Sequence, residues 1–209
     1  GYEEYSASPL EPTEIYTEKS GAEIVNEQTF TFTDRGHRSV TLRPEMTPTL
    51  ARMVAARRRS LKFPLRWYSI PNLFRYERPQ RGRRREHWQL NCDLLGIAGI
   101  EADKEIISLA YAIMKEFGAK DTDFEIRINN SNVETFKEIG PNFVLDPSLA
   151  RGQAYYTGMV FEIFDTNSEN TRAIAGGGRY DNLLEIFDVD PVPAVGFGWG
   201  DITIRDFLE

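Results

Sequence analysis

Cysteine and histidine are almost absent from this chain: Cys92 is the single cysteine, and His37 and His87 are the only histidines. A lone cysteine forms no internal disulfide and no cysteine-based zinc cage, and two histidines do not make a histidine-rich metal site. No apolar run approaches the roughly 20 residues that a membrane helix requires. The first residues lack the basic and apolar regions of a signal peptide. We therefore expect a cytoplasmic protein without membrane contact.

The composition is that of a globular protein. Of the 209 residues, 41% are hydrophobic and 12% aromatic, which is enough to bury a sizeable core in one large domain or two small ones. The net charge is −7. A net negative chain is not expected to coat nucleic acid indiscriminately.

The positive charge of the chain is concentrated in two arginine clusters. Six arginines lie between residues 75 and 85, with Glu77 as the single acid among them, and a shorter run comprises residues 57–59. Every basic residue in both clusters is arginine, which favours bidentate contact with phosphate or carboxylate. For the run at 57–59 we keep the simpler interpretation of a solvated helix end.

Alternating and helical hydrophobic patterns predict an α+β fold on a mostly antiparallel sheet flanked by helices. No G-x-G-x-x-G turn follows the first strand, so a doubly wound parallel sheet is not expected. The predicted strands are residues 29–33, 40–42, 65–70, 72–77, 87–97, 124–128, 155–164 and 173–178, and the predicted helices are residues 11–18, 47–59, 106–117 and a short one from Tyr180.

The strongest chemical signal is the segment 74–90, FRYERPQRGRRREHWQL. On a strand, Arg75 and Glu77 project from the same face, and together they can hold a phosphate and an amino group of one ligand. The returning strand places Gln89, Asn91 and Asp93 on one face. A cross-strand ion-pair ladder is the simpler alternative, but six arginines against one acid do not fit it.

This segment resembles the second signature motif of class II aminoacyl-tRNA synthetases, and four other segments narrow the resemblance to the histidyl-tRNA synthetase family. They follow in the family's order along nearly the whole chain: Ser8-Pro9-Leu10 at the end of the first motif, TLRPEMT at 41–47, ARGQAYYTG at 150–158, and AGGGRYD at 175–181 with VGFGWG at 195–200 around the third motif.

The resemblance implies an ATP site. Arg75 and Arg151 would be the catalytic residues, both gripping the α-phosphate of ATP, where negative charge builds up during attack. Glu77 would accept a hydrogen bond from the adenine amino group. His87 occupies the position at which the family stacks a phenylalanine on adenine. Residues Gly176, Gly177 and Gly178 would let the backbone approach the nucleotide closely.

The resemblance also implies a histidine site. Its members would be Glu45, Thr47, Gln89 and Asp93 for the α-ammonium group, Arg83 for the carboxylate, and Tyr155 and Tyr156 for the imidazole. The expected reaction is activation of histidine with ATP to histidyl-adenylate, followed by transfer to tRNA(His). Mg²⁺ would be bound mainly by the phosphates, without a metal site built from side chains. A homodimer is expected because the family's first motif forms its dimer interface.

The chain departs from the family pattern in several places. Thr203 stands where the third motif, G-x-G-x-x-R, has its arginine, and a helix would turn Arg205 roughly 200° away from that position. Gln153-Ala154 replaces the Leu-Asp of many relatives. Twenty residues separate Asn130 from Arg151, where the family carries a much longer insertion.

These departures bear on which domains are present and on whether the chain is catalytically active. We expect residues 1–209 to be a catalytic core without that insertion and without the C-terminal anticodon-binding domain, with a junction near 129–132 or 140–142. The main alternative is a catalytically silent, synthetase-like regulatory subunit that binds histidine or a protein partner. Thr203 favours this alternative, whereas the intact Arg75, Glu77 and Arg151 favour the enzyme. A class II synthetase for another amino acid fits the tyrosine pair at 155–156 less well.

Overall fold

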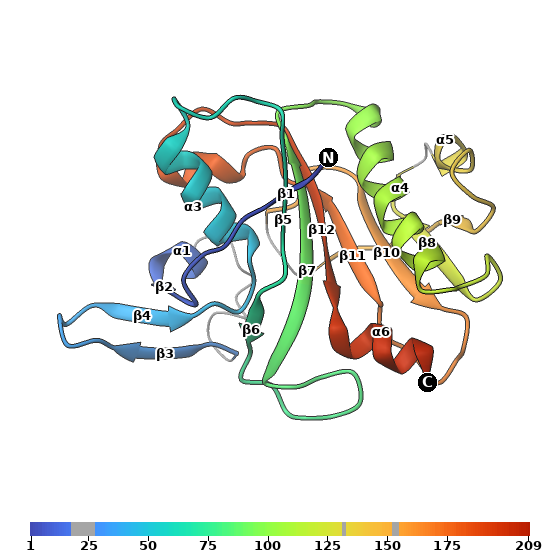
Figure 1. Ribbon diagram of the computed structural model, residues 1–209, viewed down its shortest axis with the longest axis horizontal. Helices are drawn as coiled ribbons and strands as arrows, with labels where there is room; N and C mark the ends of the chain where they lie inside the picture. The colour runs from blue at the N-terminus through green and yellow to red at the C-terminus, as the bar shows by residue number, and fades with distance from the viewer. Residues whose placement is uncertain (18–27, 131–132, 152–154) are drawn as a thin grey trace.

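One large sheet forms the centre of the computed structural model, which describes residues 1–17, 28–130, 133–151 and 155–209 (Figure 1). Its outermost pairs, β1–β5 and β8–β9, are parallel, and every pair between them is antiparallel. The predicted α+β fold on a mostly antiparallel sheet is thus confirmed. In spatial order the strands are β1 (Glu3–Glu4), β5 (Leu65–Ser69), β7 (Glu86–Leu95), β12 (Ala194–Gly200), β11 (Ala175–Arg179), β10 (Val160–Asp165), β8 (Phe124–Ile128) and β9 (Phe143–Leu145), and β6 (Asn72–Phe74) pairs with β7.

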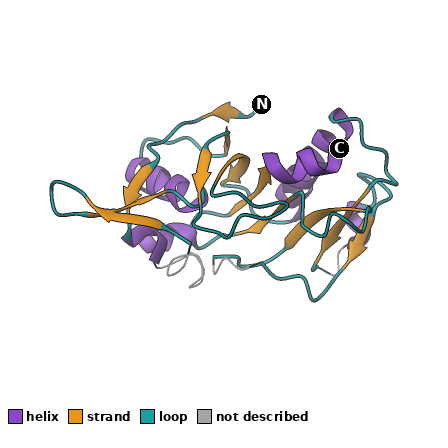
Figure 2. Cartoon of the chain, turned by 90° about the horizontal axis from the view of Figure 1, so that it is seen from below, coloured by secondary structure: helices purple, strands orange, loops and turns teal. Residues whose placement is uncertain are grey.

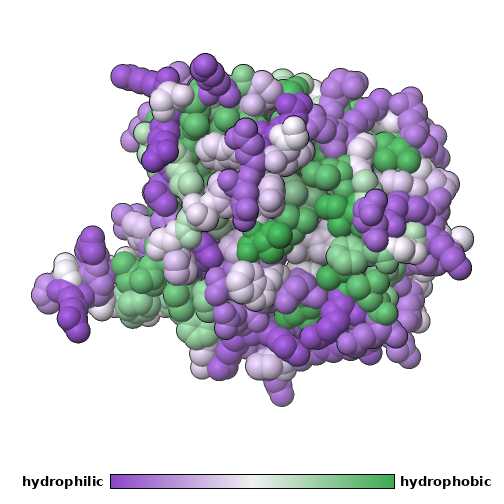
Figure 3. Space-filling view, viewed as in Figure 1, coloured by the Kyte–Doolittle hydropathy of each residue, from purple (hydrophilic) through white to green (hydrophobic). Residues whose placement is uncertain are grey.

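A second, three-stranded sheet projects from the body of the molecule (Figures 1 and 2). It consists of β2 (Leu10–Pro12), β4 (Ser39–Leu42) and β3 (Phe30–Thr33). The strands β3 and β4 correspond to the strands that the sequence predicts over 29–33 and 40–42. At the tip of the β3–β4 hairpin, Asp34 Oδ1 accepts hydrogen bonds from the backbone N–H groups of Gly36 and Arg38 at 2.8 and 2.9 Å. Leu10 and Phe32 are exposed on this sheet, and apolar side chains gather near the base of the hairpin (Figure 3).

The prediction of a helix over 11–18 is wrong at its start. Glu11 and Pro12 belong to β2, and the helix α1 covers only Glu14–Thr17. Glu11 is buried and bonded to Arg52 on α3 (Thr47–Arg57) at 2.7 and 2.8 Å. This tertiary contact and the pairing with β4 outweigh the local helical pattern. Glu18 lies outside the described residues.

Helix α4 (Ile100–Glu116) packs on one face of the large sheet against β7, β11 and β12. It begins earlier than predicted, so that Glu101 and Asp103 lie inside its first turn, where acids are favourable. Gly118, with φ of +86°, follows its C-terminus as the sequence suggested. The remaining helices are α5 (Val133–Phe136), the 3₁₀ helix η1 (Leu183–Phe187), which packs on α3, and α6 (Asp201–Leu208), which packs on β7 and β12.

Strand alternation divides the large sheet into an apolar face and a glycine-floored face. Phe197 and its partner Cys92 point into the core beneath α4. On the opposite face, Asp93 is paired with Gly196, and Asn91 with Gly198. Gly198 is paired in turn with Gly176 on β11, and Gly176 with Glu162 on β10. A row of glycines, which carry no side chains, therefore separates the polar residues of β7 from Glu162 of β10 on this face of the sheet.

Two predicted strands are shorter than expected at functionally relevant points. β6 ends at Phe74, because the backbone N–H of Glu77 donates to the carbonyl of Arg75 at 2.8 Å and turns the chain. β10 begins only at Val160, so Tyr155 and Tyr156 precede it. No described helix is both long enough and apolar enough to cross a membrane.

Candidate functional site

Two adjoining cavities open over the glycine-floored face of the sheet. The smaller encloses about 90 Å³ and the larger about 430 Å³. They share a wall, so the same side chains can contact ligands in both. The shared residues are Arg75, Gln89, Arg151, Gly176 and Gly198.

The smaller cavity contains two buried carboxylates, each bonded to a tyrosine. Glu45 Oε2 accepts a hydrogen bond from the Tyr155 hydroxyl at 2.8 Å, and Asp93 Oδ1 accepts one from the Tyr180 hydroxyl. Burial raises the pKa of Asp93 to about 7, although the bond from Tyr180 opposes this shift. Two carboxylates at the bottom of a narrow polar cavity suit a small cationic group such as an ammonium ion.

The AGGGRYD segment both lines this cavity and ties it to the scaffold. Tyr180 contributes the hydroxyl just described, while Arg179 bonds to Asp103 of α4 at 2.5 Å and to Asp181 at 3.1 Å. Asp181 also accepts a hydrogen bond from the backbone N–H of Ala194 at 2.9 Å. These bonds fix the orientation of β11 relative to α4 and β12, and therefore the position of the Tyr180 hydroxyl.

Arg151 lies in the wall between the cavities and has free hydrogen-bonding capacity. Its Nη1 is 2.6 Å from Oε1 of Glu162, whereas its buried Nε has no hydrogen-bond partner among the described residues. A Cβ atom on Gly176 would lie 1.8 Å from Arg151 Nη1, so only glycine leaves room for the guanidinium group at this point. The Arg151 side chain lines both cavities, so its guanidinium group lies beside any anion that binds at the shared wall.

The larger cavity is lined by an excess of positive charge. Five arginines face two glutamates, and both glutamates are already paired: Glu77 with Arg83 at 3.0 Å, and Glu162 with Arg151. The arginines without a paired acid in this lining are residues 75, 84 and 172. Such a lining suits a polyanion.

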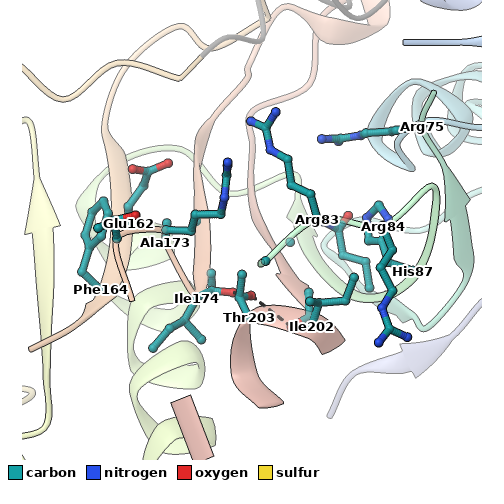
Figure 4. Close-up of a pocket in the computed structure, with 18 of the residues that line it drawn as sticks. Arg75, Arg83, Arg84, His87, Glu162, Phe164, Ala173, Ile174, Ile202 and Thr203 are labelled. Carbon is teal, nitrogen blue, oxygen red and sulfur yellow. Dashed lines mark hydrogen bonds between the residues drawn. The ribbon is translucent and has the colours of Figure 1, made fainter. Parts of the chain in front are cut away.

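His87 contributes a ring but no charge to this cavity. Burial, together with the nearby Arg75, lowers the pKa of His87 to about 4, so its imidazole is neutral around pH 7. In Figure 4, His87, Arg75 and Arg83 lie on one side of the cavity, Glu162 and Phe164 on the other, and Ile202 and Thr203 at its base.

The structure brings most of the predicted site residues together. The smaller cavity is lined by Glu45, Thr47, Arg75, Gln89, Asp93, Arg151, Tyr155, Tyr156 and Gly176, and the larger by Arg75, Glu77, Arg83, His87, Gln89, Arg151 and Gly176. Arg75 and Glu77 meet the same cavity even though they are not on a strand. The motif positions 152–154 lie outside the described residues.

Three of the predicted site residues do not lie where the resemblance implied. Arg83, expected near the histidine carboxylate, lines the larger cavity and is bonded to Glu77. Gly177 and Gly178 line neither cavity. Alternation along β11 turns Gly177 toward Phe197, and Gly178 lies beneath Tyr156, whose ring would be 3.0 Å from an added Cβ.

Sequence reasoning missed Glu162, Arg172 and Tyr180 as site residues. Strand alternation could have identified Glu162, since it lies between the apolar Phe161 and Ile163 and therefore projects from the opposite face of β10, where it is paired with Gly176. No local pattern distinguishes Arg172 from other loop arginines. Its position depends on the fold of segments far apart in the chain.

Comparison with known proteins decides the family. A family model described as "Histidyl-tRNA synthetase" matches residues 1–139 and 131–200. The histidine–tRNA ligases of Leptospira biflexa and Thermoplasma volcanium are each 36% identical to this chain over 291 residues, covering 100% of it and 67% of each relative. The chain belongs to the histidyl-tRNA synthetase family.

Solved structures of the histidyl-tRNA synthetase family have the same fold. The S. aureus histidyl-tRNA synthetase is 27% identical, with a TM-score of 0.78 over 99% of this chain and 59% of that chain. A Bacillus halodurans protein described as an ATP phosphoribosyltransferase regulatory subunit/histidyl-tRNA synthetase gives a TM-score of 0.82 at 22% identity, over 100% of this chain and 75% of that chain. At that identity the likeness concerns the fold alone.

The chain spans about two thirds of the length of the curated relatives that it matches. The match to the Leptospira relative extends over 291 residues, whereas this chain has 209, a difference of 82. The two ranges matched by the family model meet at residues 131–139.

Proposed function

We propose that this chain activates histidine with ATP to form histidyl-adenylate and passes the histidyl group to tRNA(His). The observation that carries the proposal is the wall shared by the two cavities. Arg75 and Arg151 line both of them, so a carboxylate in the smaller cavity and an α-phosphate in the larger would meet between two guanidinium groups.

The proposed placement of histidine follows from the smaller cavity. Its α-ammonium group would lie against Asp93, Gln89 and Thr47, and its ring against Tyr155 and Tyr156, with Glu45 holding the Tyr155 hydroxyl. A site that hydrogen-bonds a ring nitrogen discriminates strongly against side chains without one, because its polar groups are then left unpaired. We therefore expect histidine to bind in strong preference to leucine.

The proposed placement of ATP follows from the larger cavity. The adenine amino group would donate to Glu77, the neutral ring of His87 would stack on the base, and the arginines would contact the phosphates. Gly176 would allow the backbone and Arg151 to approach the α-phosphate. Arg83, which is bonded to Glu77, would act at this cavity and not at the histidine carboxylate.

In the proposed reaction, an oxygen of the histidine carboxylate attacks the α-phosphorus of ATP. The bond from this phosphorus to the β-phosphate oxygen breaks, and pyrophosphate leaves with the electron pair. No general base is needed because the carboxylate is already ionised at neutral pH. A terminal ribose hydroxyl of tRNA then attacks the histidyl carbonyl, its proton passes to a phosphate oxygen of the adenylate, and AMP leaves with the electron pair of the broken C–O bond. The protein contributes positioning and charge neutralisation.

Mg²⁺ belongs to the proposal as a companion of the nucleotide. The described residues contain no cluster of three His, Cys, Asp or Glu side chains that could hold a metal ion. Both glutamates of the larger cavity are already bonded to arginines. The phosphates would therefore supply most of the ligands, as Mg²⁺ commonly allows.

Histidine-dependent exchange of pyrophosphate into ATP tests this function on the purified chain. We expect exchange with histidine and none above background with leucine. ATP and histidine that bind but support no exchange would favour the second candidate, a regulatory subunit. That candidate is supported by one observation, Thr203 in place of the family's arginine at the base of the larger cavity.

We also propose that the 82-residue difference in matched length lies between β8 and Arg151, where the described part of residues 129–151 holds α5 and β9. If an inserted domain is absent there, tRNA loses contacts that histidine and ATP do not use. Adenylate formation should then be retained better than aminoacylation, which parallel measurements of the two steps can show.

A homodimer is the proposed assembly. The β2–β4–β3 sheet begins at Leu10, inside the segment that resembles the first motif, and it exposes Leu10 and Phe32 at 42% and 47%. Exposed apolar side chains on a projecting sheet are typical of protein interfaces. Sedimentation at tens of micromolar, an order of magnitude chosen from typical interface affinities, should show dimers, and a purely monomeric result would contradict the proposal.

A further inference from the structure

The base of the larger cavity lacks the arginine that the third motif would place there. Thr203 at this position donates its hydroxyl hydrogen bond to the carbonyl oxygen of Ile174 at 2.9 Å. Arg205, the next arginine of α6, does not line the cavity. It lies 3.6 Å from Asp206 and from Glu209, with 47% of its side chain exposed. Neither residue brings positive charge to the base.

Arg172 brings a positive charge to the same place from a different element. It lies two residues before Ile174, the residue to which Thr203 is bonded. Arg172 and Thr203 both line the larger cavity, and both also line a neighbouring hollow of about 230 Å³. The arginine therefore enters from the segment before β11, beside the position where α6 carries threonine.

The stem of Arg172 is held over the arginine-rich loop. Its Cδ lies 2.7 Å from the point that a Cβ on Gly82 would occupy, and Gly82 has φ of +74°. A glycine at this point serves both the left-handed backbone and the close approach of the arginine. The Arg172 side chain thus extends from the segment before β11 toward Gly82 of the arginine-rich loop.

Arg172 has no acid of its own. Among the described residues it forms no ion pair, and Glu77, the acid that acts on it electrostatically, is bonded to Arg83. Burial and then repulsion by Arg83 lower the pKa of Arg172, while Glu77 opposes the shift. A guanidinium group beside other arginines and without a carboxylate is stabilised when an anion binds.

We propose that Arg172 binds the terminal phosphates of ATP and thereby takes the place of the arginine that the family carries at position 203. This assignment rests on the proposed function. Arg75 and Arg151 lie at the wall shared with the smaller cavity, where the α-phosphate would be. Arg172 lies at the Gly82 and Thr203 end, so its forked guanidinium group would meet the β- and γ-phosphates.

The test compares ATP with AMP, since only ATP carries the terminal phosphates. Binding of each nucleotide is measured by calorimetry on the wild-type chain and on Arg172→Ala, Arg172→Lys and the control Arg205→Ala. We expect Arg172→Ala to weaken ATP binding on the order of 10-fold or more, as for loss of a charge-assisted contact. AMP binding should be unchanged, Arg172→Lys should be intermediate, and Arg205→Ala should match the wild type for both nucleotides.

The possible results separate this assignment from the proposed function. If the wild type binds ATP and Arg172→Ala binds it equally well, the assignment to Arg172 is wrong while the proposed function stands. Equal weakening of ATP and AMP would place Arg172 at the nucleoside or α-phosphate and overturn the assignment as well. If the wild type binds no ATP, the proposed function itself fails. Thermal unfolding checks that each variant is folded, and Arg172→Gln serves if the alanine variant is not.

Discussion

The two cavities differ in how their charges are satisfied before any ligand binds. In the smaller, the carboxylates of Glu45 and Asp93 are buried and bonded to tyrosine hydroxyls. In the larger, arginines outnumber the acids and three of them have no paired acid in the lining. A buried charge is costly without partners, whereas a half-exposed arginine is solvated. The smaller cavity is thus organised before any ligand binds, whereas the larger one keeps guanidinium groups without a paired acid.

Arg151 links the two cavities, and its removal should have the largest effect. Arg151→Ala should slow adenylate formation by ~10²–10³ and leave histidine binding nearly intact, because the contact is made to charge that develops in the transition state. Arg151→Lys should recover only part of the rate, since an ammonium group lacks the guanidinium fork. Single-turnover adenylate formation and equilibrium histidine binding provide the two measurements.

Equal losses in binding and in rate for Arg151→Ala would show that the assigned role is wrong. In that case Arg151 would not be a catalytic residue shared by the two cavities, and the regulatory-subunit interpretation would gain support. Asp93→Ala, in the smaller cavity, is the comparison for Arg151→Ala. It should weaken equilibrium histidine binding more than it slows adenylate formation.

The organised cavity should be sensitive to pH through Asp93, whose pKa is raised to about 7 by burial. The ammonium group of histidine requires the ionised carboxylate, so histidine affinity should fall as the pH drops through about 7. Asp93→Asn should weaken binding about 10- to 100-fold, as expected for a hydrogen bond to a charged group. Calorimetry between pH 5.5 and 8.5 measures both effects. The Asn variant should retain only the pH dependence of the ligand's own imidazole, which titrates near 6.5.

The free energy of unfolding should also depend on pH through Asp93, and the direction of this dependence follows from the pKa shift. The folded pKa of Asp93 lies above the unfolded value of 3.8, so the native state holds a proton that the unfolded state has lost. The contribution of this group to the free energy of unfolding therefore falls as the pH rises from about 4 to about 7 and is constant above that. Asp93→Asn should remove this slope. An unchanged slope in urea unfolding would assign it to other groups.

Gly176→Ala tests the wall between the cavities without removing any charge. The added Cβ would overlap Arg151 Nη1 at 1.8 Å and force the guanidinium group away from Glu162. We expect ~10-fold slower adenylate formation, because a catalytic group that is misplaced by about 1 Å loses much of its effect. Gly158→Ala is the control, since its Cβ would lie at an ordinary 3.5 Å from Arg179. Similar rates for both variants would contradict the importance of this contact.

Substitution of His87, whose neutral ring lines the larger cavity, should have the smallest effect on ATP binding. Because burial lowers its pKa to about 4, His87 should contribute no pH dependence to ATP binding between pH 6 and 8. His87→Phe should change ATP affinity by no more than about threefold, since one flat ring replaces another in stacking on a base. Nucleotide titrations at pH 6, 7 and 8 measure this. A large loss would mean that an imidazole nitrogen contacts the ligand.

The sequence predicted the fold class and most of the cavity linings because the relevant signals are local. Alternation placed Gln89 and Asp93 on one face, and the resemblance to the family implied that Arg75 lies near Arg151. The partners of these residues were not predictable in this way. Asp93 and Tyr180 are 87 residues apart, and Glu45 and Tyr155 are 110 apart. Such bonds depend on the order in which strands lie side by side in the sheet, which local patterns do not encode.

The wall shared by the two cavities has a consequence for inhibition. A single molecule that joins an aminoacyl group to a nucleoside through a stable linker would occupy both cavities at once. Once one half is bound, the other half is presented to its cavity at a high effective concentration, and the loss of translational freedom occurs only once. The affinity of such a linked ligand should exceed that of either half by several orders of magnitude, provided that its linker fits between Arg75 and Arg151.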